Sequence, residues 1–162
     1  MRRRLEIALA AIAVVCASGC ARGATPQSAP PPGETTGEPG SIIVEVVGLR
    51  NEEGQVLIAL FRSSDGFPDD RDKAQASAAV RIHDRTARHE FEDVPPGDFA
   101  IGVLHDENEN FEMDTNIFGI PQEGYGASRN PAPRLGPPRY RESRLILPAG
   151  ERVLVRIQVV YP

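Results

Sequence analysis

One short segment carries most of the side chains that could do chemistry. Residues 106–114 read D-E-N-E-N-F-E-M-D, with oxygen-bearing side chains at positions 1, 3, 5 and 9 of the segment. This is the spacing with which a loop wraps a calcium ion, and position 7 then adds a backbone carbonyl. The metal ligands that this pattern predicts are Asp106, Asn108, Asn110, Glu112 through its carbonyl, and Asp114.

Two departures from the calcium-loop pattern keep a second interpretation open. Position 6, where the sharp turn favours Gly, is Phe111, and position 12, which normally supplies a bidentate Glu, is Ile117. Asp and Asn side chains also accept hydrogen bonds from nearby backbone N–H groups in Asx-turns, which need no ion. The segment is thus either a calcium site or a self-capped turn, and Ca²⁺ is the only cofactor that the sequence indicates.

Catalytic chemistry has a weaker basis. Of the three histidines, only His105 ends an apolar alternation, and it directly precedes Asp106. A histidine beside a carboxylate can act as a general base, so a hydrolase using these two residues is one hypothesis. The alternative is a hydrogen-bonded histidine that orients the adjacent loop. The sequence contains no G-x-S-x-G, H-E-x-x-H, P-loop or dinucleotide-binding motif, and we expect no enzyme.

The long segment 106–142 has no clear hydrophobic periodicity, but its many Gly and Pro residues indicate fixed turns. Loops of this length in small domains are usually functional or disordered. Its aromatic residues either pack the loop against the domain or line a binding surface. We expect an ordered contact loop with the following candidate binding residues: His105, Phe118, Gly124, Tyr125 and Tyr140.

The rest of the domain, 41–162, consists of short strand-like segments separated by turn signals. The expected strands are 42–47, 55–61, 77–82, 88–94, 99–105, 143–147 and 152–161. The polar turns between them are typical of hairpins, the first joining 42–47 to 55–61. One helical turn is expected near 69–76, where interleaved acidic and basic residues indicate a solvated charged face. The prediction is an all-β fold, an antiparallel β-sandwich of about seven strands with one long ordered loop.

Three strings are similar to those of a bacterial family. They are F-R-S-S-D-G-F-P (61–68), V-P-P-G-D-F-A-I-G-V-L-H-D-E-N-E-N (94–110) and D-T-N-I-F-G-I-P-Q-E-G-Y-G (114–126). They resemble small exported proteins, number 2141 in the domain-of-unknown-function series. The resemblance covers 42–161 and implies a prealbumin-like or immunoglobulin-like β-sandwich without an established activity. Where the family usually reads D-E-N-G-N-G, Glu109 and Phe111 replace two glycines.

The N-terminus predicts export with a lipid anchor. Three Arg residues, at 2–4, precede an apolar run from Ile7 to Val15 and the small residues before Cys20. This order is typical of a secretory signal peptide, which we place at 1–19, and the run is too short for a permanent transmembrane helix. The ending S-G-C also resembles a bacterial lipoprotein signal, which implies lipid attachment at Cys20 and contact with a membrane. Ordinary secretion with cleavage nearby is the alternative.

Residues 20–40 are rich in Pro and Gly and have few side chains to bury, so we expect a disordered tether. The residue after Cys20 is Ala21 rather than Asp, which by the same resemblance implies the outer membrane, facing the periplasm or the cell surface. The folded part has no thiol, which excludes a disulfide scaffold and a cysteine nucleophile. A net charge of −5 without a basic stripe argues against nucleic acid as a partner.

These features together predict a lipid-anchored binding or interaction module of the cell envelope. Its contact element would be the loop 106–142, with calcium ordering 106–114, and its partner an unknown protein or glycan. The alternative is a purely structural envelope protein. The two differ in what a loop substitution should do: a binding module loses a ligand and keeps its fold, whereas a structural protein loses stability.

Overall fold

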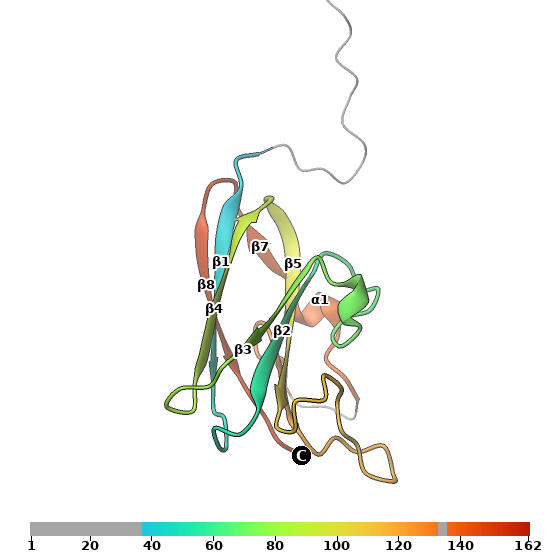
Figure 1. Cartoon of the computed structure of the whole chain (residues 1–162). Helices are drawn as coiled ribbons and strands as arrows, with labels where there is room; N and C mark the ends of the chain where they lie inside the picture. Colours follow the sequence, from blue (N-terminus) through green and yellow to red (C-terminus); the bar gives the residue numbers. More distant parts are fainter. Residues whose placement is uncertain (1–36, 133–135) are drawn as a thin grey trace, which may run out of the picture.

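Two β-sheets pack face to face in the computed structural model, which describes residues 37–132 and 136–162 (Figure 1). In this part of the chain one sheet has the strand order β4-β1-β8, and the other has the order β3-β2-β5-β6 with β7 paired to the start of β5. The expected all-β sandwich is confirmed. The strands are β1 Gly40–Val47, β2 Gln55–Phe61, β3 Ala76–Val80, β4 Ala87–Val94, β5 Gly97–Asp106, β6 Gly124–Ala127, β7 Leu145–Leu147 and β8 Arg152–Gln158.

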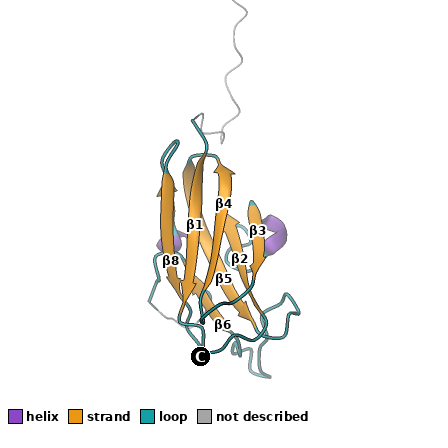
Figure 2. Ribbon diagram, turned by 60° about the vertical axis from the view of Figure 1, so that its left-hand side comes forward, coloured by secondary structure: helices purple, strands orange, loops and turns teal. Residues whose placement is uncertain are grey.

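Two short helical pieces complete the described elements. A 3-10 helix, η1, spans Arg71–Lys73 and matches the expected helical turn, and an α-helix, α1, spans Tyr140–Ser143. Neither has the length and apolar character needed to cross a membrane. Figure 2 shows both lying outside the sheets.

Alternating side chains of the strands fill the space between the two sheets. Successive residues of a strand point to opposite faces, so each central strand contributes one apolar row to the core. Full burial of such a side chain stabilises the fold by roughly 1.5–3 kcal/mol, which makes the sandwich a firm support for its loops. The buried rows of β1, β2, β5 and β8 are Ile42, Val44, Val46, Val56, Ile58, Leu60, Phe99, Ile101, Val103, Val155 and Ile157.

The expected hairpin of 42–47 with 55–61 is wrong. β1 and β2 lie in different sheets, and so do β3 and β4, β4 and β5, and β7 and β8. Their turns carry the chain across the core from one sheet to the other. Turn residues are a local signal of a reversal, and they do not specify whether the next strand pairs with the previous one or faces it.

One strand pair departs from the expected antiparallel arrangement. β1 and β8 run parallel, in register from Ser41 opposite Arg152 to Val47 opposite Gln158, while the other paired strands described here are antiparallel. β8 arrives from β7 in the opposite sheet rather than through a hairpin. Its direction is therefore set by that crossing, and a parallel pair results.

The loop between β5 and β6, 107–123, lies at the end of the sandwich opposite to the start of β1 (Figure 1). At the start of the described chain, the Glu38 carbonyl accepts a hydrogen bond from the Gly150 N–H at 2.8 Å. Residues 37–40, which the sequence placed in the tether, thus pack against the domain. The predicted signal peptide, Cys20 and the remaining tether lie outside the described residues.

Candidate binding surface

A buried carboxylate holds the loop 107–123 together. The Glu123 side chain is 3% exposed. Its Oε1 accepts a hydrogen bond from the Glu107 N–H at 2.9 Å, and its Oε2 accepts one from the Asp114 N–H at 3.0 Å. Because a residue at the end of the loop binds the beginning and the middle, the loop is fixed as two joined turns. Sequence reasoning missed this brace, although Glu123 is the acidic residue of the string G-I-P-Q-E-G-Y-G.

The predicted calcium ligands do come together, in the turn that follows β5. Asp106 is fully buried, and its Oδ1 accepts the Asn110 N–H at 3.1 Å. Its Oδ2 accepts the Phe111 N–H at 3.1 Å and the Gln55 side-chain N–H at 2.9 Å. The amide oxygen of Asn108 also accepts the Asn110 N–H, as in an Asx-turn.

The second half of this turn closes on Asp114. Its two carboxylate oxygens accept hydrogen bonds from the side-chain Nδ2 groups of Asn108 at 2.7 Å and Asn110 at 3.0 Å. The Asn110 amide oxygen accepts the Glu112 N–H at 2.8 Å, so NH₂ groups rather than oxygens face the carboxylate. Among the described residues, no group of three or more His, Cys, Asp and Glu is placed to hold a metal ion. Hydrogen bonds within the turn thus occupy these oxygens, and calcium binding stays a prediction of the sequence.

The turn is tight despite its missing glycines. Glu109 has a φ of 58° and Phe111 a φ of 67°, both in the left-handed region that favours Gly. A side chain in this region costs roughly 1–2 kcal/mol per residue. These are the two positions at which the family resemblance leads us to expect Gly. The hydrogen bonds to Asp106 and Asp114 offset this conformational cost. The side chain at position 111 is thus retained despite the strain, and its ring contacts Arg71.

His105 lies beneath the loop, fully buried. Its Nε2 is 2.9 Å from the Glu53 carbonyl oxygen, so this nitrogen carries the proton and donates. Its Nδ1 is 2.6 Å from the Tyr161 hydroxyl, which then donates to it, and that hydroxyl accepts the Arg50 N–H at 3.1 Å. Burial raises the pKa of the Tyr161 hydroxyl and so keeps this donor protonated. Both ring nitrogens are therefore engaged in hydrogen bonds within the fold, as expected of a histidine that orients the adjacent loop.

The remaining candidate binding residues separate into two groups. Phe118 is 80% exposed at the tip of the loop, and Tyr125 on β6 faces a groove. Gly124 and Tyr140 have packing roles instead. A Cβ at Gly124 would lie 2.3 Å from the Tyr161 ring, and the Tyr140 hydroxyl donates to the Arg62 carbonyl oxygen at 2.8 Å.

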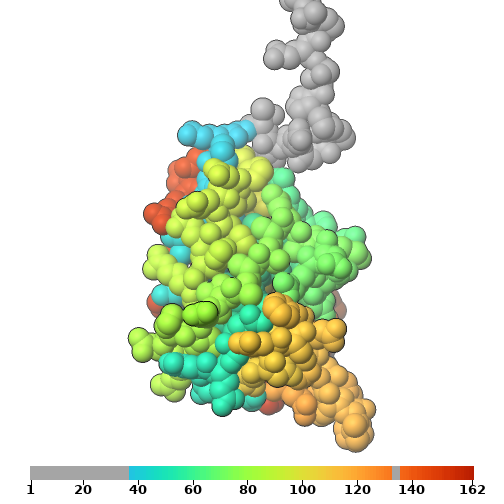
Figure 3. Space-filling model, viewed as in Figure 1, coloured from blue at the N-terminus to red at the C-terminus, as the bar shows by residue number. Residues whose placement is uncertain are grey.

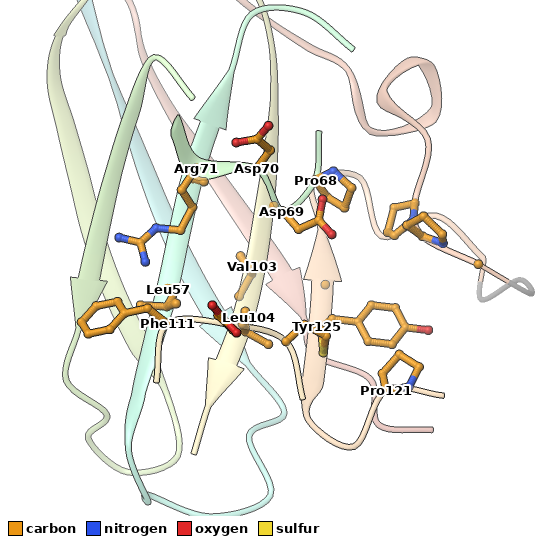
Figure 4. Close-up of a pocket in the computed structure, with 18 of the residues that line it drawn as sticks. Leu57, Pro68, Asp69, Asp70, Arg71, Val103, Leu104, Phe111, Pro121 and Tyr125 are labelled. Carbon is orange, nitrogen blue, oxygen red and sulfur yellow. The ribbon is translucent and has the colours of Figure 1, made fainter. Parts of the chain in front are cut away.

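The groove, of about 1000 Å³, lies on the outer face of the β3-β2-β5-β6 sheet (Figure 4). Its floor consists of outward-facing side chains of neighbouring strands, in which Leu57 pairs with Leu104 and Leu104 with Tyr125. One end is closed by Pro68, whose carbonyl oxygen would be 2.3 Å from a Cβ at residue 102, so only Gly102 permits this approach. The walls come from residues 68–71, the loop, and the segment after Gly136.

The side of the groove formed by η1 was not expected from the sequence. Arg71 belongs to the charged stretch that we predicted to be solvated, yet its guanidinium lies over the Phe111 ring, 5.2 Å from the ring centroid. Lys73 is closer to the prediction, since it pairs on the surface with Asp65 at 2.9 Å and Asp70 at 3.3 Å. A contact between segments 40 residues apart leaves no local pattern, so no sequence signal could have identified it.

The loop also exposes most of the large apolar side chains found on the described surface. They are Phe111 (50% exposed), Ile117 (93%), Phe118 (80%) and Ile120 (49%), and the loop projects from the body of the molecule (Figure 3). The other two, Ile146 and Leu154, lie on β7 and β8. From 106 to 128 the sequence has six acidic residues and no Lys or Arg. We call the surface formed by the loop and the groove the loop surface. It is apolar, and its exposed acidic side chains are Asp69, Glu109 and Glu112.

The protein is a small β-sandwich. Its distinctive surface consists of a braced loop with exposed apolar side chains and the groove beside it. The chain belongs to the family described as "Uncharacterized protein conserved in bacteria (DUF2141)", whose model matches residues 44–154. The match runs from within β1 to within β8 and confirms the family resemblance of the three sequence strings. No curated protein and no solved structure matches the chain.

Proposed function

We propose that this protein is a lipid-anchored binding module of the bacterial cell envelope and that the loop surface contacts its partner, a protein or a glycan. The observation that carries the proposal is that one loop is both braced internally and apolar outside. Buried Glu123 and Asp106 fix its backbone, while Ile117 and Phe118 remain 93% and 80% exposed. Contiguous exposed apolar side chains on an ordered element are typical of interaction sites.

The anchored arrangement is supported by the sequence before the domain. A lipid on Cys20 would be joined to the sandwich by a Pro- and Gly-rich tether. β1 begins at the end of the sandwich opposite to the loop (Figure 1). A tether entering there leaves the loop surface pointing away from the membrane that holds the lipid, and thus available to a partner in the periplasm or at the cell surface.

Site-specific photo-crosslinking in the native bacterium tests the contact. A benzophenone amino acid replaces Phe118, and in a matched control it replaces Leu154, an apolar residue of β8 that is 61% exposed on the other sheet. We expect a discrete crosslinked species from position 118 and none from position 154. Equal labelling at both positions, or none at 118, would contradict the proposal. A drop in the melting temperature of the Phe118 variant would favour the structural alternative.

The anchor has its own test. Cys20→Ala removes the thiol to which a lipid would be attached, and we expect the protein to lose fatty-acid labelling and to move from the membrane to the soluble fraction. Cys16→Ala is the matched control, because this cysteine lies within the predicted signal peptide. If fatty-acid label persists in the Cys20→Ala protein, the lipoprotein assignment is wrong.

A further inference from the structure

We propose that the groove of the loop surface binds an extended segment of a partner protein in which apolar side chains are flanked by Lys or Arg. The inference rests on the proposed function and names the chemistry of the partner. Three features of the groove support it: a buried guanidinium N–H without a partner, an apolar floor, and an acidic rim.

The guanidinium belongs to Arg71. Its Nε is buried and has no hydrogen-bond partner within the described residues. Buried donors are nearly always paired, so an unpaired one beside a groove indicates that a ligand supplies the acceptor. An extended peptide presents a backbone carbonyl at every residue. Arg71 and Phe111 stand on one side of the groove, and Tyr125 and Pro121 on the other (Figure 4).

The floor of the groove fits an extended chain. Leu57, Leu104 and Tyr125 stand in a row across three neighbouring strands and form an apolar floor. A volume of about 1000 Å³ is at the upper end of the range for small-molecule sites, so the groove has room for several residues of a peptide. Strained backbone persists mainly at ligand clamps and active sites, and the left-handed φ of Phe111 places its ring against Arg71 at the groove wall.

The rim selects the charge of the ligand. Asp69 and Glu112 line the groove, and Glu109 is exposed on the adjacent turn. Asp70 also lines it but is paired with Lys73, and Arg71 is the one basic side chain among the described lining residues. The net field is negative, which attracts Lys and Arg flanking an apolar segment and repels both acidic peptides and anionic bilayers. A protein segment is therefore favoured over a membrane surface.

A peptide library tests the inference even though the partner is unidentified. Random peptides of about twelve residues, displayed on phage, are selected on the full chain carrying Cys20→Ser. We expect the enriched sequences to have apolar centres and more Lys and Arg than Asp and Glu. For the best peptide, measured by fluorescence polarisation, exchange of its basic residues for Glu should raise Kd by about tenfold or more at low salt. This ratio should shrink at high salt because screening weakens the charge contribution.

Substitutions in the protein locate the binding. Arg71→Met keeps an aliphatic side chain but removes the guanidinium that lies over Phe111 and donates hydrogen bonds, and we expect it to raise Kd by about tenfold. Phe118→Ser should also weaken binding, whereas Leu154→Ser on β8 should leave Kd unchanged. The inference is overturned if no peptide is enriched, if acidic peptides are preferred, or if Arg71→Met binds as the parent does.

Three further outcomes distinguish this inference from a membrane partner and from the proposed function. Phe118-dependent binding to vesicles of phosphatidylethanolamine and phosphatidylglycerol, without peptide binding, would replace the protein partner with a membrane. If position 118 crosslinks in cells while no basic peptide is enriched, the partner chemistry proposed here is wrong and the binding role stands. If peptides bind in solution but position 118 gives no crosslink in cells, the groove chemistry is right and the proposed function fails.

Discussion

The outer faces of the two sheets differ in polarity: one is charged and the other is largely apolar. On the β4-β1-β8 sheet, charged side chains pair between strands: Glu45 of β1 with Arg156 of the adjacent β8 at 2.7 Å, and Glu90 of β4 with Arg152 of β8, across β1, at 2.6 Å. The Arg156 guanidinium lowers the pKa of Glu45, as expected for a paired carboxylate in water. Water solvates such a charged face without any further protein contact, and its ion pairs add little stability.

The outer face of the β3-β2-β5-β6 sheet is apolar and needs cover. At one end, Phe67 provides it, with its ring packed edge-on against Phe61 and Tyr140. At the other end, the cover consists of the loop 107–123, which stands off the sheet and leaves the groove. Both sheets contribute apolar rows to the core, but only the β3-β2-β5-β6 sheet also has an outer face that is largely apolar and carries a groove.

The largest test of this contrast is the removal of one carboxylate from each face. Glu123→Ala leaves the N–H groups of Glu107 and Asp114 without their acceptor, and we expect the free energy of unfolding to fall by about 3 kcal/mol. Glu45→Ala on the charged face should cost much less, because a solvated ion pair adds little stability. Urea unfolding measures both, and equal losses would show that the loop is no more dependent on its brace than the sheet is on a surface ion pair.

A smaller effect of opposite sign is expected at the strained turn. Glu109→Gly removes a side chain from a left-handed position and so relieves strain in the folded state. Gly also raises the entropy of the unfolded chain, so we expect the free energy of unfolding to rise by only about 0.5–1 kcal/mol. Phe111→Gly should stabilise the fold similarly but weaken peptide binding. The melting temperature and the peptide Kd, measured on both variants, distinguish a residue kept for the fold from one kept for the groove.

The Arg50–Glu107 ion pair of the loop makes the stability depend on pH in the acid range. Arg50 lowers the pKa of Glu107 from its usual value of 4.5, with a contribution from Asn51. The stabilisation by this pair is therefore present in full above pH 4.5 and is lost as the pH falls through the lowered pKa. The expected contribution is under about 1 kcal/mol because Arg50 is half exposed. The stability difference between the parent and Glu107→Gln should be seen at pH 7 and vanish in acid.

The smallest expected effect concerns calcium. A site occupied at 100 times its Kd would add about 2.7 kcal/mol and raise the melting temperature by several degrees. We expect the melts in Ca²⁺ and in chelator to coincide, since N–H groups already occupy the oxygens of Asp106 and Asp114. A rise in Ca²⁺ that disappears in Asp106→Ala would establish the calcium loop instead.

Much of the fold follows from local sequence. The apolar run 55–61 coincides with β2, because alternating β-branched and aliphatic residues identify a strand wherever it pairs. Pairing itself did not follow, since the same turn signals serve hairpins and crossings between sheets. β6 was missed because G-Y-G-A has no apolar alternation, and its strand conformation comes from pairing with residues 102–105 of β5.

The candidate site was only partly predictable, for a similar reason. The spacing of Asp106 to Asp114 indicated the correct turn, since its hydrogen bonds join residues close in sequence. The brace from Glu123 and the stacking of Arg71 on Phe111 join residues farther apart. Such contacts depend on how the sheets bring the segments together, which no spacing rule contains.

The parallel pairing of β1 with β8 has a consequence for the order of events in biosynthesis. The first strand of the domain is the centre of its sheet, and one of its two neighbours is the last strand to be made. A chain that crosses a membrane as an extended thread, N-terminus first, cannot complete this sheet until residues 152–158 have passed through. For an exported chain, as the N-terminus predicts, completion of the β4-β1-β8 sheet would thereby be postponed to the end of translocation.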